Sequence, residues 1–176
     1  MELNKKQNTI KYVLYCILIL LADLLQNTGG LLPSIFSAHC FLLIPVTVTL
    51  AMSEGEKEAA LIGLFGGLLW DLVSADHLGF NSIFLALFCL IASYITENLV
   101  RNVYIVNLIV SVVGVFIYSV LYWMLFVASS KDTGSFATLG YYYIPSAIYT
   151  SVISVLAVYL INLIRKKFFK KIEKLA

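Results

Sequence analysis

The sequence predicts an all-α integral membrane protein with six transmembrane helices. Of its 176 residues, 61% are hydrophobic and only 12% are charged, whereas about a quarter of the residues are charged in ordinary soluble domains. This composition cannot supply a polar surface, which excludes soluble, disordered and nucleic-acid-binding classes. The apolar runs are continuous and much longer than the alternating strands of a membrane barrel, which take roughly 10 residues. In lipid, such runs satisfy their backbone hydrogen bonds as helices.

Six apolar segments follow one another along the chain, and a transmembrane helix takes about 20 residues. The first is expected to be a span rather than a signal peptide. It has no small-residue cleavage site, and Asp23 and Gln26 interrupt its end. Short connections and the absence of a linker or repeat predict one domain. The expected spans are 10–26, 38–53, 58–74, 79–98, 104–128 and 139–164, followed by a basic tail over 165–176.

The distribution of basic residues predicts that both termini are cytoplasmic. With six spans and a cytoplasmic N-terminus, 11 of the 12 Lys and Arg residues lie on the cytoplasmic side, and only Lys131 lies outside. An odd number of spans would place the two basic termini on opposite sides. Aromatic residues at the outer ends of spans five and six suit an interfacial belt. They include Tyr118, Tyr122, Trp123, Phe126 and Tyr141–Tyr143.

Two charged features lie at the cytoplasmic side. Glu97 precedes Arg101 by four residues, the helical spacing of a structural ion pair. The tail is expected to act mainly as a stop-transfer anchor, and its second interpretation is binding of anionic lipid at about 1 kcal/mol per basic residue. Its basic residues are Arg165, Lys166, Lys167, Lys170 and Lys171, with Lys174 beyond them.

Polar residues inside the spans are the candidates for chemistry. Asp23, Gln26, His39 and Asp71 fall near one outer level, together with Asp76 and His77. Two interpretations stay open: a small-molecule or proton site, or interhelical hydrogen bonds that fix packing. The three cysteines have no CxxC spacing and no His/Cys cluster, so neither a metal site nor a cofactor is expected. No catalytic triad or dyad is visible either.

Span three carries the most specific pattern. Gly63, Gly67 and Asp71 recur every four residues and form one narrow stripe on a helix. The two glycines allow a neighbouring helix to approach closely. Asp71 then extends the contact, and the short turn ending in Leu78-Gly79 brings backbone N–H or hydroxyl groups within its reach. The pattern predicts a buried latch between spans.

This stretch resembles the rod shape-determining protein MreD family. Residues 63–79 match the family's Gly-x3-Gly-x3-Asp-Leu-x-Ser-x3-Leu-Gly pattern position for position, and Leu24-Leu25-Gln26 is similar to the motif that closes its first span. The resemblance covers roughly residues 12–98. One departure is the missing proline at the mouth of span two, where this chain reads Ser37-Ala38-His39-Cys40.

The resemblance implies a non-enzymatic component of the bacterial cell-elongation machinery in the cell membrane. The expected partners are an MreC-like membrane protein, an MreB-like cytoskeleton, and RodA-type and class B penicillin-binding peptidoglycan synthases. The implied fold is similar to the S-component bundle of energy-coupling-factor transporters. An S component that binds a vitamin through Asp23, Gln26, His39 and Asp71 is therefore the alternative function. A lipid-modifying enzyme is a third interpretation, which the missing catalytic spacing disfavours.

Overall fold

The computed structural model describes residues 5–28, 38–74, 79–99, 103–128 and 135–173, and its described elements are all helices. One helix contains a π-helical stretch and continues beyond it, and another ends in one, so the described elements join into six continuous helices. They are α1 (Lys5–Asn27), α2 (Leu43–Ala51), α3 (Glu56–Ser74), α4 (Phe80–Leu99), α5 (Val103–Tyr122) with η1 (Trp123–Val127), and α6 (Ser135–Thr138) with η2 (Leu139–Tyr143) and α7 (Ile144–Glu173).

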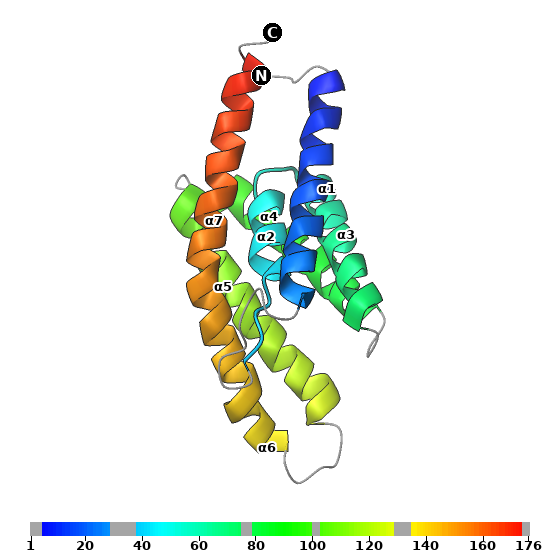
Figure 1. The fold of residues 1–176 in the computed structure, drawn as a ribbon, viewed down its shortest axis with the longest axis vertical. Coiled ribbons are helices and arrows are strands. Elements are labelled where there is room, and N and C mark those ends of the chain that lie inside the picture. Colours follow the sequence, from blue (N-terminus) through cyan, green and yellow to red (C-terminus); the bar gives the residue numbers. More distant parts are fainter. Residues whose placement is uncertain (1–4, 29–37, 75–78, 100–102, 129–134, 174–176) are drawn as a thin grey trace.

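The helices run up and down around α2. Both termini lie at one end of the molecule, and α5 and α7 extend past the other helices at the opposite end (Figure 1). Every residue of α2 is buried, and α2 contacts α1, α3, α4, α5 and α7. Its threonines turn their hydroxyls back onto the helix, with Thr47 donating to the Leu43 carbonyl and Thr49 to the Pro45 carbonyl. Both hydroxyls are therefore satisfied within the helix, and the central helix presents a mostly apolar surface to its neighbours.

Four helices are long and apolar enough to cross a membrane. Those candidate spans are Gln7–Asn27, Phe80–Glu97, Tyr104–Val127 and Phe136–Lys167. Helix α3 has 19 residues, but Glu56, Lys57 and Glu58 make its first turn charged. The described residues thus form six helices, and four of these are candidate membrane spans where the sequence predicts six.

Helix α2 is shorter than the sequence predicts, and its expected start at residue 38 is corrected to Leu43. Side chains of other helices satisfy the backbone N–H groups before it. Ser146 accepts from the His39 N–H and Thr150 from the Phe41 N–H, each at 2.9 Å. Non-helical backbone is tolerated at membrane depth where protein buries it. The nine residues of α2 reach about 14 Å, half the hydrocarbon thickness.

Candidate functional site

Helices α3 and α4 meet backbone to backbone along the glycine stripe. A Cβ added to Gly63 would lie 2.3 Å from the Leu85 carbonyl oxygen, and one added to Gly67 would lie 2.4 Å from the Ser82 Cα. Both distances are far inside van der Waals contact. Only glycine at these two positions allows the helices to approach this closely.

Asp71 lies one turn beyond Gly67 and is 3% exposed. Its Oδ1 accepts from the Asn81 backbone N–H at 3.2 Å, and its Oδ2 accepts from the Ser82 backbone N–H at 3.0 Å and from the Ser82 hydroxyl. The first N–H groups of a helix have no partner within it and carry the positive end of the helix dipole. The α3 carboxylate therefore caps the N-terminus of α4.

The turn before α4 supports this cap. Gly79 adopts φ +94°, a backbone conformation that favours glycine, and its carbonyl accepts the Ile83 N–H at 3.0 Å. The Asn81 amide donates to the Ser74 hydroxyl at 3.4 Å and accepts from the Tyr118 hydroxyl at 2.8 Å. The contact thus reaches from α3 and α4 to α5. Leu78, Asp76 and His77 lie outside the described residues.

The predicted outer polar cluster divides among different partners. Asp23 accepts from the Asn27 side chain at 2.7 Å, and Gln26 accepts from the Leu43 N–H at 2.9 Å. The His39 ring packs against Tyr142 with 5.7 Å between centroids, whereas Asp71 bonds α4. Among the described residues, no hydrogen bond joins two members of this cluster, and each anchors a different contact between or within helices.

Sequence reasoning missed a buried ion pair toward the other end of the bundle. The Lys11 ammonium lies 2.6 Å from the Glu54 carboxylate, with side chains 10% and 7% exposed, and the Tyr15 hydroxyl donates to the same carboxylate at 2.9 Å. Ser93 donates to the Glu54 backbone carbonyl at 2.6 Å. The available signal was the group of acids between spans two and three, Glu54, Glu56 and Glu58. Lys11 was interpreted only as a topology marker.

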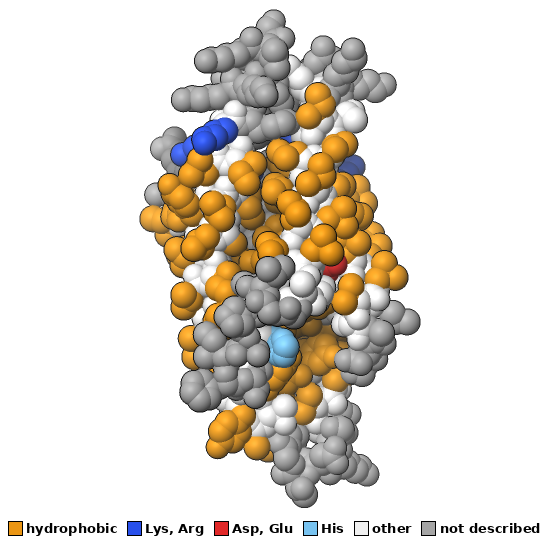
Figure 2. Space-filling model, viewed as in Figure 1, with side chains coloured by type: hydrophobic (Ala, Val, Ile, Leu, Met, Phe, Trp, Pro, Cys, Tyr) orange, Lys and Arg blue, Asp and Glu red, His pale blue; other side chains and the backbone are white. Residues whose placement is uncertain are grey.

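The remaining predicted residues lie on the cytoplasmic side of the predicted topology. Glu97 is exposed, and its expected partner Arg101 lies outside the described residues. Arg165, Lys166 and Lys167 belong to the last third of α7, with Lys166 and Lys167 exposed. The side chains of Lys170 and Lys171 lie outside the described residues. On the face shown in Figure 2, basic side chains lie toward the end that carries both termini.

The described residues contain no group of three or more His, Cys, Asp or Glu that could hold a metal ion. The glycine stripe and its aspartate cap join α3 directly to α4. Comparison with curated proteins and with solved structures gave no significant match. A family model described as rod shape-determining protein MreD matches residues 6–168, nearly the whole chain. The chain therefore belongs to the MreD family of rod shape-determining membrane proteins, which are not enzymes.

Proposed function

We propose that this chain is a scaffold of the bacterial cell-elongation machinery in the plasma membrane. In this role it holds an MreC-like membrane protein beside RodA-type and class B penicillin-binding peptidoglycan synthases and links them to an MreB-like cytoskeleton. The observation that carries the proposal is the family match over residues 6–168. A scaffold acts through its surface, so what the fold must supply is helix faces held in fixed relative positions.

The contact between α3 and α4 suits this requirement. Glycine packing and the Asp71 cap hold the two helices as one unit, while their outer faces stay apolar and exposed. Exposed side chains on this unit are Leu61, Leu64, Leu68 and Leu72 of α3 and Ile83, Leu87, Leu90 and Ile91 of α4. In our proposal Gly63, Gly67, Asp71 and Gly79 therefore act indirectly, by setting the angle at which these faces meet lipid or a partner.

The proposal includes the topology. All six helices lie within the membrane region, with α2 enclosed by the others, in a bundle similar to an S component. Both termini are cytoplasmic, which the shared end of the N- and C-termini in Figure 1 supports. The basic residues at the end of α7 then lie at the cytoplasmic surface, where they anchor the helix and attract anionic lipid.

Copurification tests the proposal. The full chain, tagged and coexpressed with the MreC-like protein and the RodA-type synthase of the same bacterium, is expected to yield a stoichiometric complex that survives detergent. A chain that retains a stoichiometric vitamin and captures neither partner would overturn the scaffold in favour of a transport component. A gene neighbourhood containing MreB and MreC homologues is the matching genomic expectation.

A complementation experiment in cells is the second test of the proposal. It uses a rod-shaped bacterial host that is depleted of its own copy of the gene. We expect the wild-type chain to restore rods and Asp71→Leu to leave round cells with less accumulated protein. Leu72→Ala, a change on the exposed face next to Asp71, is the matched control for accumulation. If Asp71→Leu accumulates, binds its partners and restores rods as the wild type does, the proposed role of this contact fails.

A further inference from the structure

A cavity of about 360 Å³ lies at the end of the bundle away from the termini. It is partly open to the surface and is lined by the ends of α3, α4 and α5, by α6 with η2, and by the segment before α2. Figure 2 shows an apolar hollow in this part of the surface, beside the pale-blue histidine side chain. Its volume falls in the range of small-molecule sites. The lining residues are Phe41, Trp70, Ser74, Asn81, Tyr118, Tyr122, Thr138, Tyr142 and Tyr143.

Aromatic rings form most of the wall and hold one another in place. Trp70 and Tyr118 stack with 4.9 Å between centroids, Phe41 packs edge-on to Tyr118 at 5.3 Å, and Tyr142 packs edge-on to Tyr143 at 4.9 Å. Interlocked rings of this kind cannot easily rotate to fill the space. The cavity is therefore preformed rather than a gap that side chains close.

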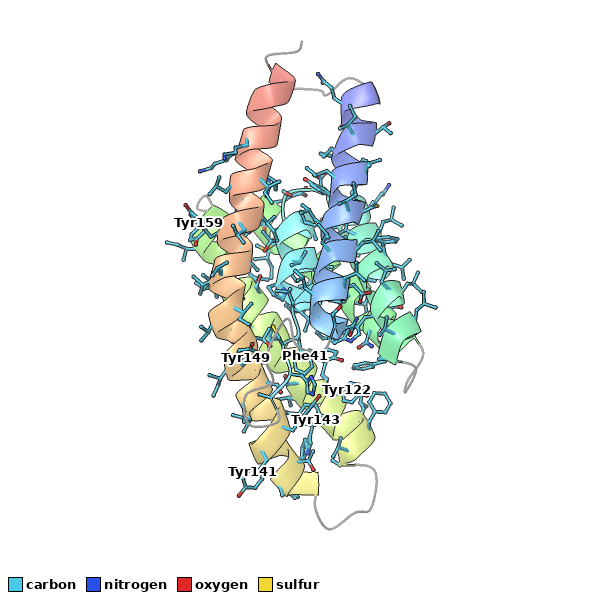
Figure 3. The ribbon with its side chains drawn as sticks, in the orientation of Figure 1. Phe41, Tyr122, Tyr141, Tyr143, Tyr149 and Tyr159 are labelled. Atoms are coloured by element: carbon cyan, nitrogen blue, oxygen red, sulfur yellow. The ribbon has the colours of Figure 1, made fainter. Side chains whose placement is uncertain are left out.

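These rings are not an interfacial belt. Belt residues face lipid headgroups and are therefore exposed at the surface of the bundle. Tyr141 has 79% of its surface exposed, whereas Trp70 and Tyr118 are 6% and 3% exposed. In Figure 3, Phe41, Tyr122 and Tyr143 gather in one region between the helices, and Tyr141 points away from it. The aromatic side chains of the cavity are directed inward, where they cannot contact the membrane interface as belt residues do.

The cavity also has a polar edge with unused hydrogen-bonding capacity. Asn81 donates one amide hydrogen to Ser74 at 3.4 Å and accepts from Tyr118 at 2.8 Å, which leaves its second amide hydrogen available. The Ser74 and Tyr118 oxygens likewise keep acceptor capacity. A wholly apolar occupant would leave these groups unpaired at a cost.

The charge of the lining residues further limits which ligands the cavity can bind. Among the residues that the structure describes, none that lines the cavity is charged, and the nearby Asp71 carboxylate is already occupied by three donors of α4. A charged ligand would give up its hydration without meeting a counter-charge. Ring faces for stacking combined with an amide and hydroxyls at one edge suit a ring that is neutral and polar at its rim.

We propose that this cavity binds an uncharged ring-shaped molecule that stacks on its aromatic walls and presents hydroxyl or amide groups to Asn81, Ser74 and Tyr118. Sugars and neutral heterocyclic amides share this chemistry. The proposal stands on the cavity alone and does not depend on the scaffold function: a scaffold that binds such a ligand would be able to respond to it.

The two tryptophans of the chain make the test direct. Trp70 lines the cavity, whereas Trp123 packs against Phe136 at 5.4 Å and does not line it. In the full chain carrying Trp123→Phe, selectively excited tryptophan fluorescence therefore comes from Trp70 alone. The protein, in a detergent without a sugar headgroup, is titrated separately with methyl glucoside, nicotinamide and tetramethylammonium. Tyr142→Ala removes a wall ring, and Tyr141→Ala is the matched control next to it.

We expect methyl glucoside or nicotinamide to change Trp70 emission saturably, with binding at least tenfold weaker in Tyr142→Ala and unchanged in Tyr141→Ala. Binding of methyl glucoside would indicate a sugar as the ligand, and binding of nicotinamide would indicate a neutral heterocyclic amide. Should Tyr142→Ala lose its folded elution profile, Tyr142→Leu replaces it. The proposal is overturned if neither neutral probe saturates, if Tyr142 substitution leaves their binding unchanged, or if only tetramethylammonium binds, which would make the cavity a cation cage.

Discussion

Two buried carboxylates, Asp71 and Glu54, connect helices toward opposite ends of this bundle, and different kinds of partner stabilise their charges. Asp71 meets only donors, two backbone N–H groups and a hydroxyl at the N-terminus of α4. Glu54 meets the ammonium of Lys11 at 2.6 Å and the hydroxyl of Tyr15 at 2.9 Å, both from α1. One carboxylate is stabilised by a helix end and the other by a cation.

The difference matters because the partners of the two carboxylates differ in what else they can bind once the carboxylate interaction is lost. The N–H groups of Asn81 and Ser82 are buried by the glycine packing whether or not an acceptor is present, and among the described residues Asp71 is their acceptor. The Lys11 ammonium lies on a long flexible stem that can move toward water when its partner is lost. Losing Asp71 should therefore cost more than losing Lys11, although only Glu54 has a formal counter-charge.

The largest effect is expected for Asp71→Leu. The substitution leaves the Asn81 and Ser82 N–H groups without an acceptor in a buried site, which should cost about 3 kcal/mol of stability. Asp71→Asn keeps one acceptor oxygen and should lose about half as much by the same reasoning. Thermal unfolding in detergent, followed by loss of the monodisperse chromatographic peak, measures both. Equal melting of Asp71→Leu and wild type would show that the cap contributes nothing.

A smaller loss is expected for Gly67→Ala. The new methyl group would overlap the α4 backbone at Ser82, and because backbone cannot rotate aside, the two helices must separate, at about 2 kcal/mol. Gly140→Ala is the matched control, since an added Cβ there meets no atom within 4 Å. The same melting assay should place Gly67→Ala well below Gly140→Ala. If the two variants melt together, the close approach of α3 and α4 is not what the glycines provide.

Length and apolarity were enough to predict most helices of this fold. Helices α1, α3, α4, α5 and α7 lie where long apolar runs predict them, because the requirement for internal backbone hydrogen bonds in lipid is local. The beginning of α2 was not predictable in this way. The N–H group of its first residue is satisfied by Gln26, and N–H groups before it are satisfied by Ser146 and Thr150, which lie more than 100 residues away.

The candidate site residues also divide into features that depend on local sequence and features that depend on packing between distant segments. Gly63, Gly67 and Asp71 share a helix face, and helical periodicity alone reveals that. Membrane depth can be estimated from position along a span, which is why Asp23, Gln26, His39 and Asp71 were placed at one level. The direction in which each side chain points around its helix depends on packing. The structure accordingly gives these four residues separate partners.

The smallest of the three effects is expected at the Lys11–Glu54 pair. Lys11→Met removes the cation while leaving the carboxylate with Tyr15, and since both side chains keep some exposure, the loss should be about 1 kcal/mol, below that of a fully buried pair. Adding Glu54→Gln removes the unpaired charge, so the double variant should melt above Lys11→Met alone. Lys57→Met, which removes a cation from the first turn of α3, is the control. The single variant Glu54→Gln completes the double-mutant cycle. If the stability loss of the double variant equals the sum of the losses of Lys11→Met and Glu54→Gln, the pair is not coupled, and α1 is held against the α2–α3 turn by apolar packing alone.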